Sequence, residues 1–220
     1  LVRWSNKALN NPRPDEFIPI AELTRKIIPL GAFVMEKALS DFKVIKKQVN
    51  DNIDAISINI STVELFDNDF IERTTHLLDE SQVSPDSIIL EVTETCLLKD
   101  MKMAKKRLSI LNEKGIRIAL DDFGTGYSSL TYLKNLPISI IKIDKSFTQD
   151  IDIDMNDMEI IKAVIMLANS LELKLVAEGA ETQEQVDFLR EHGCRIIQGY
   201  YYAKPMSKDS VIKFINNFIK

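Results

Sequence analysis

Two adjacent aspartates, Asp121 and Asp122, are the residues whose types and spacing point most directly to chemistry. They follow the apolar run 116–120 and precede a glycine-rich stretch at 123–129. Neighbouring carboxylates raise one another's pKa, and a bound divalent cation reverses this effect because it stabilises both ionised forms. The pair therefore indicates a metal site. The alternative is that the aspartates only shape a turn or cap a helix.

Polar side chains also stand at or just past the ends of the other apolar runs. They are Asn59, Glu91, Lys142, Glu178 and Gln198. The carboxylate and amide oxygens among them suit Mg²⁺ or Mn²⁺, whereas sulfur and imidazole are missing from these run ends, so we do not expect zinc chemistry. Lys142 brings a cation to the carboxylates. It serves either the reaction or only as a salt-bridge partner that holds the acids together.

A repeated pattern of short apolar runs and longer periodic segments must position these residues. The apolar runs predict strands at 55–60, 88–92, 116–120, 138–143, 173–177 and 195–197. The periodic segments predict helices at 70–81, 101–114, 160–171 and 182–192, after a helical region at about 18–49. The polar stretch 148–159 predicts a loop that enters a helix. Continuous apolar strands between helices are typical of a parallel sheet covered on its faces.

Such a repeat fits either an open doubly wound sheet or a closed (β/α)8 barrel. The polar strand ends distinguish the two folds. In a barrel these ends converge on one face, whereas an open sheet spreads them along an edge. Because six predicted strands carry polar residues at this end, the α/β barrel is favoured.

Composition limits the remaining possibilities. The chain has 220 residues, 45% of them hydrophobic, which is enough for one sizeable core and predicts a single domain over 1–220. Its net charge of −5 provides no general basic field, so we expect neither DNA nor RNA as a partner. Cys96 and Cys194 have neither metal nor redox spacing and are expected to be reduced and structural.

Targeting signals and membrane segments are not expected in this sequence. No apolar run reaches membrane-spanning length, and the chain opens on Leu1 with neither an initiator methionine nor a signal peptide. We therefore expect a cytoplasmic module from a longer parent protein, which could carry a membrane anchor elsewhere. The amphipathic basic segment 207–220 could touch a membrane surface, but packing against the barrel wall is favoured.

A series of sequence motifs, in the same order along the chain, resembles that of the EAL-domain phosphodiesterases, which hydrolyse the bacterial second messenger cyclic di-GMP. The resemblance covers essentially all of the chain. It rests on LVRW at 1–4, EFIPIAE at 16–22, INIS at 58–61, EVTE at 91–94, DDFGTGYSS at 121–129, KIDKSF at 142–147, AEGAET at 177–182 and QGY at 198–200.

The resemblance implies a modified TIM barrel with one antiparallel strand, which binds cyclic di-GMP and two divalent ions, Mg²⁺ or Mn²⁺, and releases linear pGpG. The residues that it assigns to metal are Asn59, Glu91, Asp121, Asp122 and Glu178, the last holding metal or its water. It assigns Lys142 to positioning or deprotonating the attacking water. It assigns Arg3 to a ligand phosphate, Gln198, Glu181 and Tyr200 to the lining of the site, and Glu94 to bracing the loop after Asp122.

Two departures from the family pattern bear on activity. Leu1 aligns with the leucine of the Glu-Ala-Leu signature, so the signature glutamate and the strand before it would precede this chain, which implies an N-terminally truncated barrel. Ser139 stands where the family often has aspartate. We therefore expect a phosphodiesterase in the parent protein, with the activity of this chain left open. The alternative function is a catalytically impaired module that binds cyclic di-GMP or a partner protein.

The resemblance also implies partners. In the family the loop 123–130 and the helix after it couple the site to a dimer interface, so we expect a homodimer. Sensory or GGDEF-type domains are expected elsewhere in the parent protein. The domain itself is not expected to insert into a membrane.

Overall fold

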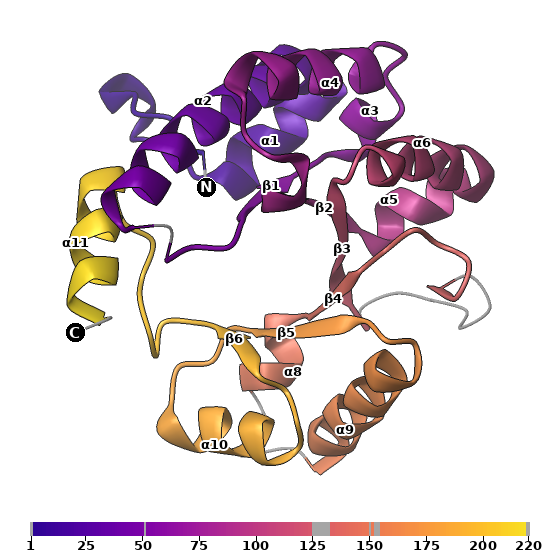
Figure 1. Cartoon of the computed structure of the whole chain (residues 1–220), viewed down its shortest axis with the longest axis vertical. Coiled ribbons are helices and arrows are strands. Elements are labelled where there is room, and N and C mark those ends of the chain that lie inside the picture. The colour runs from indigo at the N-terminus through magenta and orange to yellow at the C-terminus, as the bar shows by residue number, and fades with distance from the viewer. Residues whose placement is uncertain (1, 51, 125–132, 150, 152–154, 219–220) are drawn as a thin grey trace. The chain divides into compact units, whose positions relative to one another are not determined.

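The computed structural model describes residues 2–50, 52–124, 133–149, 151 and 155–218. These residues form two compact units, one of Leu1–Ile88 with Pro205–Lys220 and one of Ile89–Lys204 (Figure 1). Most of the loop 123–130, which is expected to couple the site to a dimer interface, lies outside the described residues, namely its positions 125–130.

The first unit is mainly helical. Its elements are η1 (Lys7–Leu9), α1 (Pro14–Leu23), α2 (Ile27–Gln48), β1 (Ile56–Asn59), α3 (Thr62–Leu65), α4 (Phe70–Ser81), η2 (Pro85–Ser87) and α11 (Lys208–Phe218). The predicted helix at 70–81 is confirmed, and the helical region at 18–49 consists of parts of α1 and α2. Between these two helices Arg25 has a φ of 58°, a left-handed conformation that interrupts helical hydrogen bonding.

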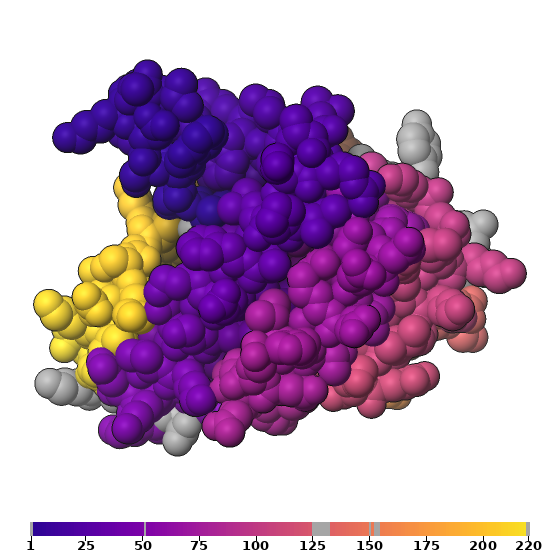
Figure 2. Space-filling view, turned by 90° about the horizontal axis from the view of Figure 1, so that it is seen from above, coloured from indigo at the N-terminus to yellow at the C-terminus, as the bar shows by residue number. Residues whose placement is uncertain are grey.

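Helix α2 forms the centre of this unit. It buries Ile27, Met35, Leu39 and Phe42, which recur at helical spacing and so lie on one face. Helix α11 lies against α2, and Figure 2 shows it in yellow beside the purple surface. Lys208 Nζ pairs with Asp41 Oδ1 at 3.1 Å. The C-terminal helix thus packs against the fold, which is the interpretation favoured above.

The second unit is built on parallel strands. They are β2 (Ile88–Thr93), β3 (Arg117–Phe123), β4 (Ile140–Ile143), β5 (Lys174–Glu178) and β6 (Ile196–Gln198), paired in that order. The helices of this unit are α5 (Glu94–Lys99), α6 (Met101–Glu113), α8 (Lys145–Gln149), α9 (Met155–Ser170) and α10 (Gln183–Glu191). The prediction of parallel strands alternating with helices is confirmed.

Strand β4 shows why the apolar runs form this sheet. All four of its residues are buried, so both of its faces are covered, and a continuous run of isoleucines replaces the alternation of a half-exposed strand. Helix α9 packs on β4 and β5 (Figure 1). Its residues Ile161, Ile165 and Ala168 are buried. Full burial of one isoleucine side chain is worth about 1.5–3 kcal/mol.

Three local differences separate the prediction from the structure. Helix α9 begins at Met155, and α8 covers 145–149, so the predicted loop 148–159 is too long. Helix α5 was not predicted; its N-cap is Thr93, whose side chain accepts the Cys96 N–H at 3.3 Å. Strand β3 continues through both aspartates, with a register irregularity between Leu120 and Phe123.

Helix length also bears on membranes. Among the elements described above, no helix is long and apolar enough to cross a lipid bilayer.

Candidate active site

Four polar side chains from neighbouring strands meet in the second unit. Glu91 lies on β2, Asp121 on β3, Lys142 on β4 and Glu178 at the end of β5. Ile141 pairs with Leu120, and Lys142 then stands opposite the irregular stretch between Leu120 and Phe123 that contains Asp121. Lys142 in turn pairs with Val176, and residues two apart share a face, which brings Glu178 to the same side of the sheet.

The ammonium group of Lys142 lies among three carboxylates. Its Nζ is 2.7 Å from Glu178 Oε1, 2.8 Å from Glu91 Oε2 and 3.0 Å from Asp121 Oδ1. The lysine side chain is only 6% exposed and the glutamate on β2 only 7%, so water screens these attractions weakly. The arrangement is a buried cluster of formal charge −2, if all four groups are ionised.

Burial and charge act against each other in this cluster. Burial lowers the pKa of Lys142, but the attraction of Glu91, Asp121 and Glu178 outweighs it and raises that pKa above its ordinary value. Burial raises the pKa of the Glu178 carboxyl, an effect that the charge of Lys142 only partly offsets. The ammonium ion is thus strongly held, whereas the cluster disfavours a further negative charge.

Asp121 has an acceptor atom that the cluster leaves without a hydrogen bond. Lys142 is close enough to Asp121 Oδ1 for an ion pair, but the buried oxygen has no hydrogen-bond partner of suitable geometry. Buried acceptors of this kind are rare in folded proteins and often mark sites of function. An incoming cation could use this oxygen without breaking a hydrogen bond.

Asp122 differs from its neighbour in conformation and in charge. It has a left-handed backbone, with φ at 53°. Burial, and then the charges of Asp121 and Asp144, raise the pKa of its carboxyl. Burial also acts on Asp144, but hydrogen bonds from Ser146 Oγ at 2.5 Å and from the Ser146 N–H at 2.9 Å keep the pKa of Asp144 below its ordinary value. The two neighbouring carboxyls therefore differ in the direction of their pKa shift, upward for Asp122 and downward for Asp144.

The donor set of this cluster fits a hard divalent cation. Carboxylate oxygens are the ligands that Mg²⁺ and Mn²⁺ prefer, and the orphaned oxygen of Asp121 offers a ready contact. Across the described ranges, no group of three or more His, Cys, Asp or Glu side chains is arranged so that it could hold a metal ion. The cation that the acids share in this structure is the Lys142 ammonium.

Four further residues predicted for the site also lie in the second unit. Glu94 opens α5 and is 3% exposed, with neither carboxylate oxygen hydrogen-bonded. Gln198 ends β6 beside Glu178, its register partner. Glu181 and Tyr200 are exposed, and Lys204 Nζ lies 5.5 Å from the centre of the Tyr200 ring. None of these four belongs to the ion pairs of Lys142 described above.

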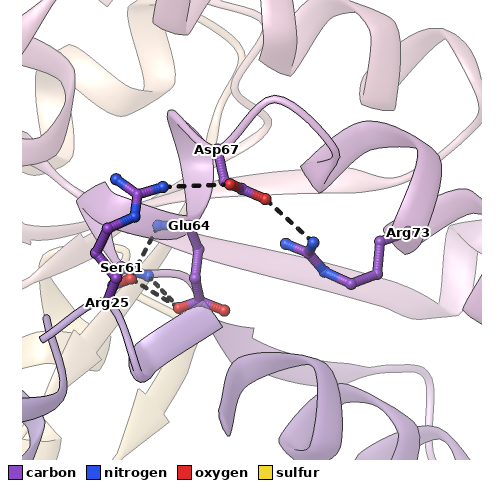
Figure 3. A network of polar contacts seen from close by, with 5 residues as sticks. All are labelled: Arg25, Ser61, Glu64, Asp67 and Arg73. Atoms are coloured by element: carbon purple, nitrogen blue, oxygen red, sulfur yellow. Dashed lines mark hydrogen bonds and ion pairs between the residues drawn. The ribbon is translucent and has the colours of Figure 1, made fainter. Parts of the chain in front are cut away.

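Asn59 and Arg3 belong to the first unit. Asn59 is the exposed last residue of β1. It is followed by Ser61, whose hydroxyl caps α3, and by Glu64, whose carboxylate accepts the Ser61 N–H and hydroxyl, as Figure 3 shows. Arg3 is exposed and donates to the Val2 carbonyl at 3.0 Å.

Sequence reasoning missed two residues that the structure places beside the predicted ones. Asp144 comes one position after the end of β4, and the motif that contains it, KIDKSF at 142–147, supported only the family resemblance. Gln185 lies within the predicted helix 182–192 and was given no role, yet it is 5% exposed. Thr182 and Gln185 stand three apart before an apolar periodic run, which is the sequence signal of a capping box and could have identified Gln185.

Comparison with known proteins gives these residues a family context. A family model described as EAL domain matches residues 1–205. In Pseudomonas aeruginosa, the cyclic di-GMP phosphodiesterase NbdA is 35% identical over 99% of this chain and 28% of its own length. The bifunctional diguanylate cyclase/cyclic di-GMP phosphodiesterase MucR is 34% identical over 96% of this chain and 31% of its own length. The chain thus spans about a third or less of these relatives.

Solved structures agree with the sequence matches. A complex of the PaMucR phosphodiesterase with c-di-GMP has a TM-score of 0.91 at 34% identity, and the match covers 96% of this chain and 85% of that one. The EAL enzyme Bd1971, bound to cAMP and cyclic di-GMP, has a TM-score of 0.92 at 32% identity, covering 97% and 58%.

These matches confirm the fold class predicted from the sequence, an α/β fold of the TIM-barrel type. Phosphodiesterases with this domain generally depend on divalent metal ions. Matches over most of the chain, in sequence and in structure, have one explanation: the chain belongs to the EAL domain family.

Proposed function

We propose that this chain hydrolyses cyclic di-GMP to linear pGpG. The observation that carries the proposal is the buried Lys142 among Glu91, Asp121 and Glu178, because a chain that only bound a ligand would have little use for so costly a cluster. The names of the relatives, phosphodiesterases of cyclic di-GMP, support the same substrate.

We further propose that the site takes two divalent ions, Mg²⁺ or Mn²⁺. The proposed ligands are Asn59, Glu91, Asp121, Asp122 and Glu178. When bound, the ions would neutralise phosphate charge and lower the pKa of water, as in other two-metal hydrolases. The oxygen-only donor set and the orphaned Asp121 oxygen support this choice.

The chain's own groups have distinct parts in the reaction. Lys142, which the carboxylates hold as an ammonium ion, would position rather than deprotonate a water whose oxygen attacks one phosphorus atom in line with the departing ribose 3′ oxygen. The P–O3′ bond breaks, the 3′ oxygen takes up a proton, and the new 5′-phosphate keeps the oxygen of the water. Arg3, Glu181, Gln198 and Tyr200 would bind the dinucleotide. Glu94 would brace the loop after Asp122.

The extent of the domain, its oligomeric state and its location are also part of the proposal. Residues 1–220 would act as one EAL domain, which the continuous family match over 1–205 supports. We expect a homodimer, and a parent protein with fused sensory or GGDEF-type domains, as the bifunctional name of MucR suggests. Two buried, reduced cysteines suit a cytoplasmic location.

The test uses the whole chain with cyclic di-GMP and Mg²⁺. Wild type should release pGpG, and chelation of the metal should stop release. Asp121→Asn should abolish hydrolysis, because it removes a charged ligand while it keeps the size of the side chain. Near wild-type turnover in this variant would overturn the metal assignment. Binding of cyclic di-GMP by wild type without any product would instead establish the alternative, an impaired binding module.

A further inference from the structure

Gln185 is a buried amide at the start of α10, outside the ion-pair cluster. It is 5% exposed and carries no charge. Buried side-chain amides are kept in folds only when their donors and acceptors find partners. The partners of Gln185 therefore indicate what its burial achieves.

The oxygen of this amide holds the turn that follows β5. Gln185 Oε1 accepts the N–H of Glu181 at 2.7 Å and the N–H of Thr182 at 3.1 Å. The Thr182 hydroxyl accepts the Gln185 N–H at 3.3 Å in return, which completes a capping box. The turn begins directly after Glu178, so its backbone course is fixed by this side chain.

The nitrogen of the same amide reaches a different part of the chain. Gln185 Nε2 donates to the Gln149 carbonyl at 3.2 Å, across 36 positions of sequence. Gln149 is the last residue of α8. This helix begins two residues after the end of β4, the strand that carries Lys142. One side chain thus ties the segment after β4 to the turn after β5.

Backbone packing holds this turn from two more directions. Ala180 N–H donates to the Gln198 carbonyl at 3.3 Å, and the Ala180 carbonyl accepts the Tyr201 N–H at 3.0 Å. A Cβ atom on Gly199 would overlap the Ala180 backbone, so only glycine allows this approach. These contacts therefore fix the backbone of the turn that follows Glu178.

We propose that Gln185 is a positioning residue that keeps Glu178 at its 2.7 Å contact with Lys142. The inference rests on the proposed function, since it assigns Gln185 to the same reaction. An amide can accept the two N–H groups with its oxygen and also donate to the Gln149 carbonyl with its nitrogen, whereas an ionised carboxylate can only accept. A carboxylate keeps the acceptor half and loses the donor half.

Three variants of the full chain separate positioning from helix capping. Gln185→Glu keeps the cap and removes the tether to Gln149, whereas Gln185→Ala removes both. The matched control is Asp100→Ala, because Asp100 caps α6 by accepting the Met103 N–H at 3.0 Å and lies on the exposed surface. It should lower the unfolding temperature as a lost cap does without touching the site.

Two measurements test the inference: turnover of cyclic di-GMP, assayed well below the unfolding temperature of each variant, and the Mg²⁺ dependence of the unfolding temperature itself. With cyclic di-GMP, Gln185→Glu should lower kcat about tenfold with KM changed less than twofold, the size of effect seen when the support of a metal ligand is lost. Without substrate, the Mg²⁺ concentration that gives half of the maximal rise in unfolding temperature should increase about tenfold. Asp100→Ala should change neither quantity.

Wild-type kcat and Mg²⁺ dependence in Gln185→Glu would overturn the inference. If wild type released no pGpG, the proposed function would fail, yet the Mg²⁺ titration would still decide the role of Gln185. A titration that shifts in Gln185→Glu but not in Asp100→Ala would support positioning. Equal shifts in the two variants would reduce Gln185 to a helix cap.

Discussion

Lys142 in the second unit and Glu64 in the first are both charged residues, each 5% exposed when the whole residue is counted, but the fold accommodates them differently. Lys142 has three carboxylates within 3.0 Å. Glu64 instead accepts the Ser61 hydroxyl at 2.7 Å and the Ser61 N–H at 3.1 Å, while its neighbour Asp67 takes the arginines (Figure 3).

The pKa directions express this difference. The pKa values of Lys142 and Glu64 are both raised. A raised pKa means that the fold favours the charged form of the lysine but the neutral form of the glutamate. Burial is the main cause for Glu64, and the Ser61 hydrogen bonds only partly offset it. The candidate site thus holds its charge with opposite charges, whereas the first unit holds a carboxylate through local hydrogen bonds. Only the former arrangement is poised to exchange one cation for another.

The largest effect is expected when the cation is removed. Lys142→Met leaves three buried carboxylates facing one another, which should lower the free energy of unfolding by about 3–5 kcal/mol. Urea unfolding measures the loss. Mg²⁺ should then stabilise this variant more than it stabilises wild type, because the carboxylates lack their own cation.

The matched control for this variant is Lys162→Met. Lys162 pairs with Glu159 at 2.8 Å on the surface of α9, so its loss should cost less than about 1 kcal/mol. A loss as small in Lys142→Met would contradict the view that the cluster depends on its cation.

A smaller effect is expected where Glu64 meets α2. A Cβ atom on Gly31 would overlap the Glu64 carboxylate. Gly31→Ala should therefore destabilise the chain by about 1–3 kcal/mol through overpacking. In a Glu64→Ala background the same change should stabilise it by up to about 1 kcal/mol, since alanine favours helix over glycine. A double-mutant cycle in urea tests this reversal of sign; additive effects would rule out the contact.

The pH dependence of stability provides a third test. Because the fold raises the pKa of Glu64, its contribution is fully present below the ordinary glutamate pKa, about 4.3, and is lost as pH rises through the folded value. Glu64→Gln does not titrate. Its free energy of unfolding minus that of wild type should therefore increase between pH 4 and pH 7.

Urea titrations of the two chains at each pH measure this difference. Arg73 and Glu22, whose charges also act on Glu64, are present in both chains and so largely cancel. A difference that stays constant with pH would mean that the fold stabilises the charged and the neutral forms of Glu64 equally.

The smallest effect is expected at the exposed edge of the same network. Arg25 lies 3.4 Å from Asp67 and its side chain is 66% exposed, so Arg25→Met should change the free energy of unfolding by less than about 0.5 kcal/mol. Arg73 lies 3.1 Å from the same carboxylate and is 25% exposed. Arg73→Met should cost more, and the reverse order in thermal unfolding would contradict the ranking by burial.

Features that depend on residues close together in the sequence could be predicted, whereas features that depend on distant residues could not. Strands such as β4 could be predicted because burial on both faces demands a continuous apolar run. The first turn of α9 could not, because Asn156, Asp157 and Glu159 are as common in loops as at the start of a helix. The role of Gln185 could not be predicted either, since its partner Gln149 stands 36 positions away and uses only its backbone carbonyl.

The strand ends lie between these extremes. Glu91, Asp121, Lys142 and Glu178 were identified as strand-end residues from local pattern alone, because parallel strands bring their carboxyl ends to one edge. Which atoms would touch was not predictable, since this depends on strand register. The left-handed turn at Asp122 was hidden as well, because nothing in an Asp-Asp pair fixes the sign of φ.

The buried cysteines have a practical consequence. Cys96 and Cys194 are 1% and 0% exposed, and burial raises the pKa of the Cys194 thiol to about 11. Thiol reagents react with exposed thiolates, so neither residue should compete with a cysteine introduced on the surface. Wild-type protein is therefore a ready background for attaching one fluorophore to each unit, and energy transfer between the dyes would follow any movement that Mg²⁺ or cyclic di-GMP induces.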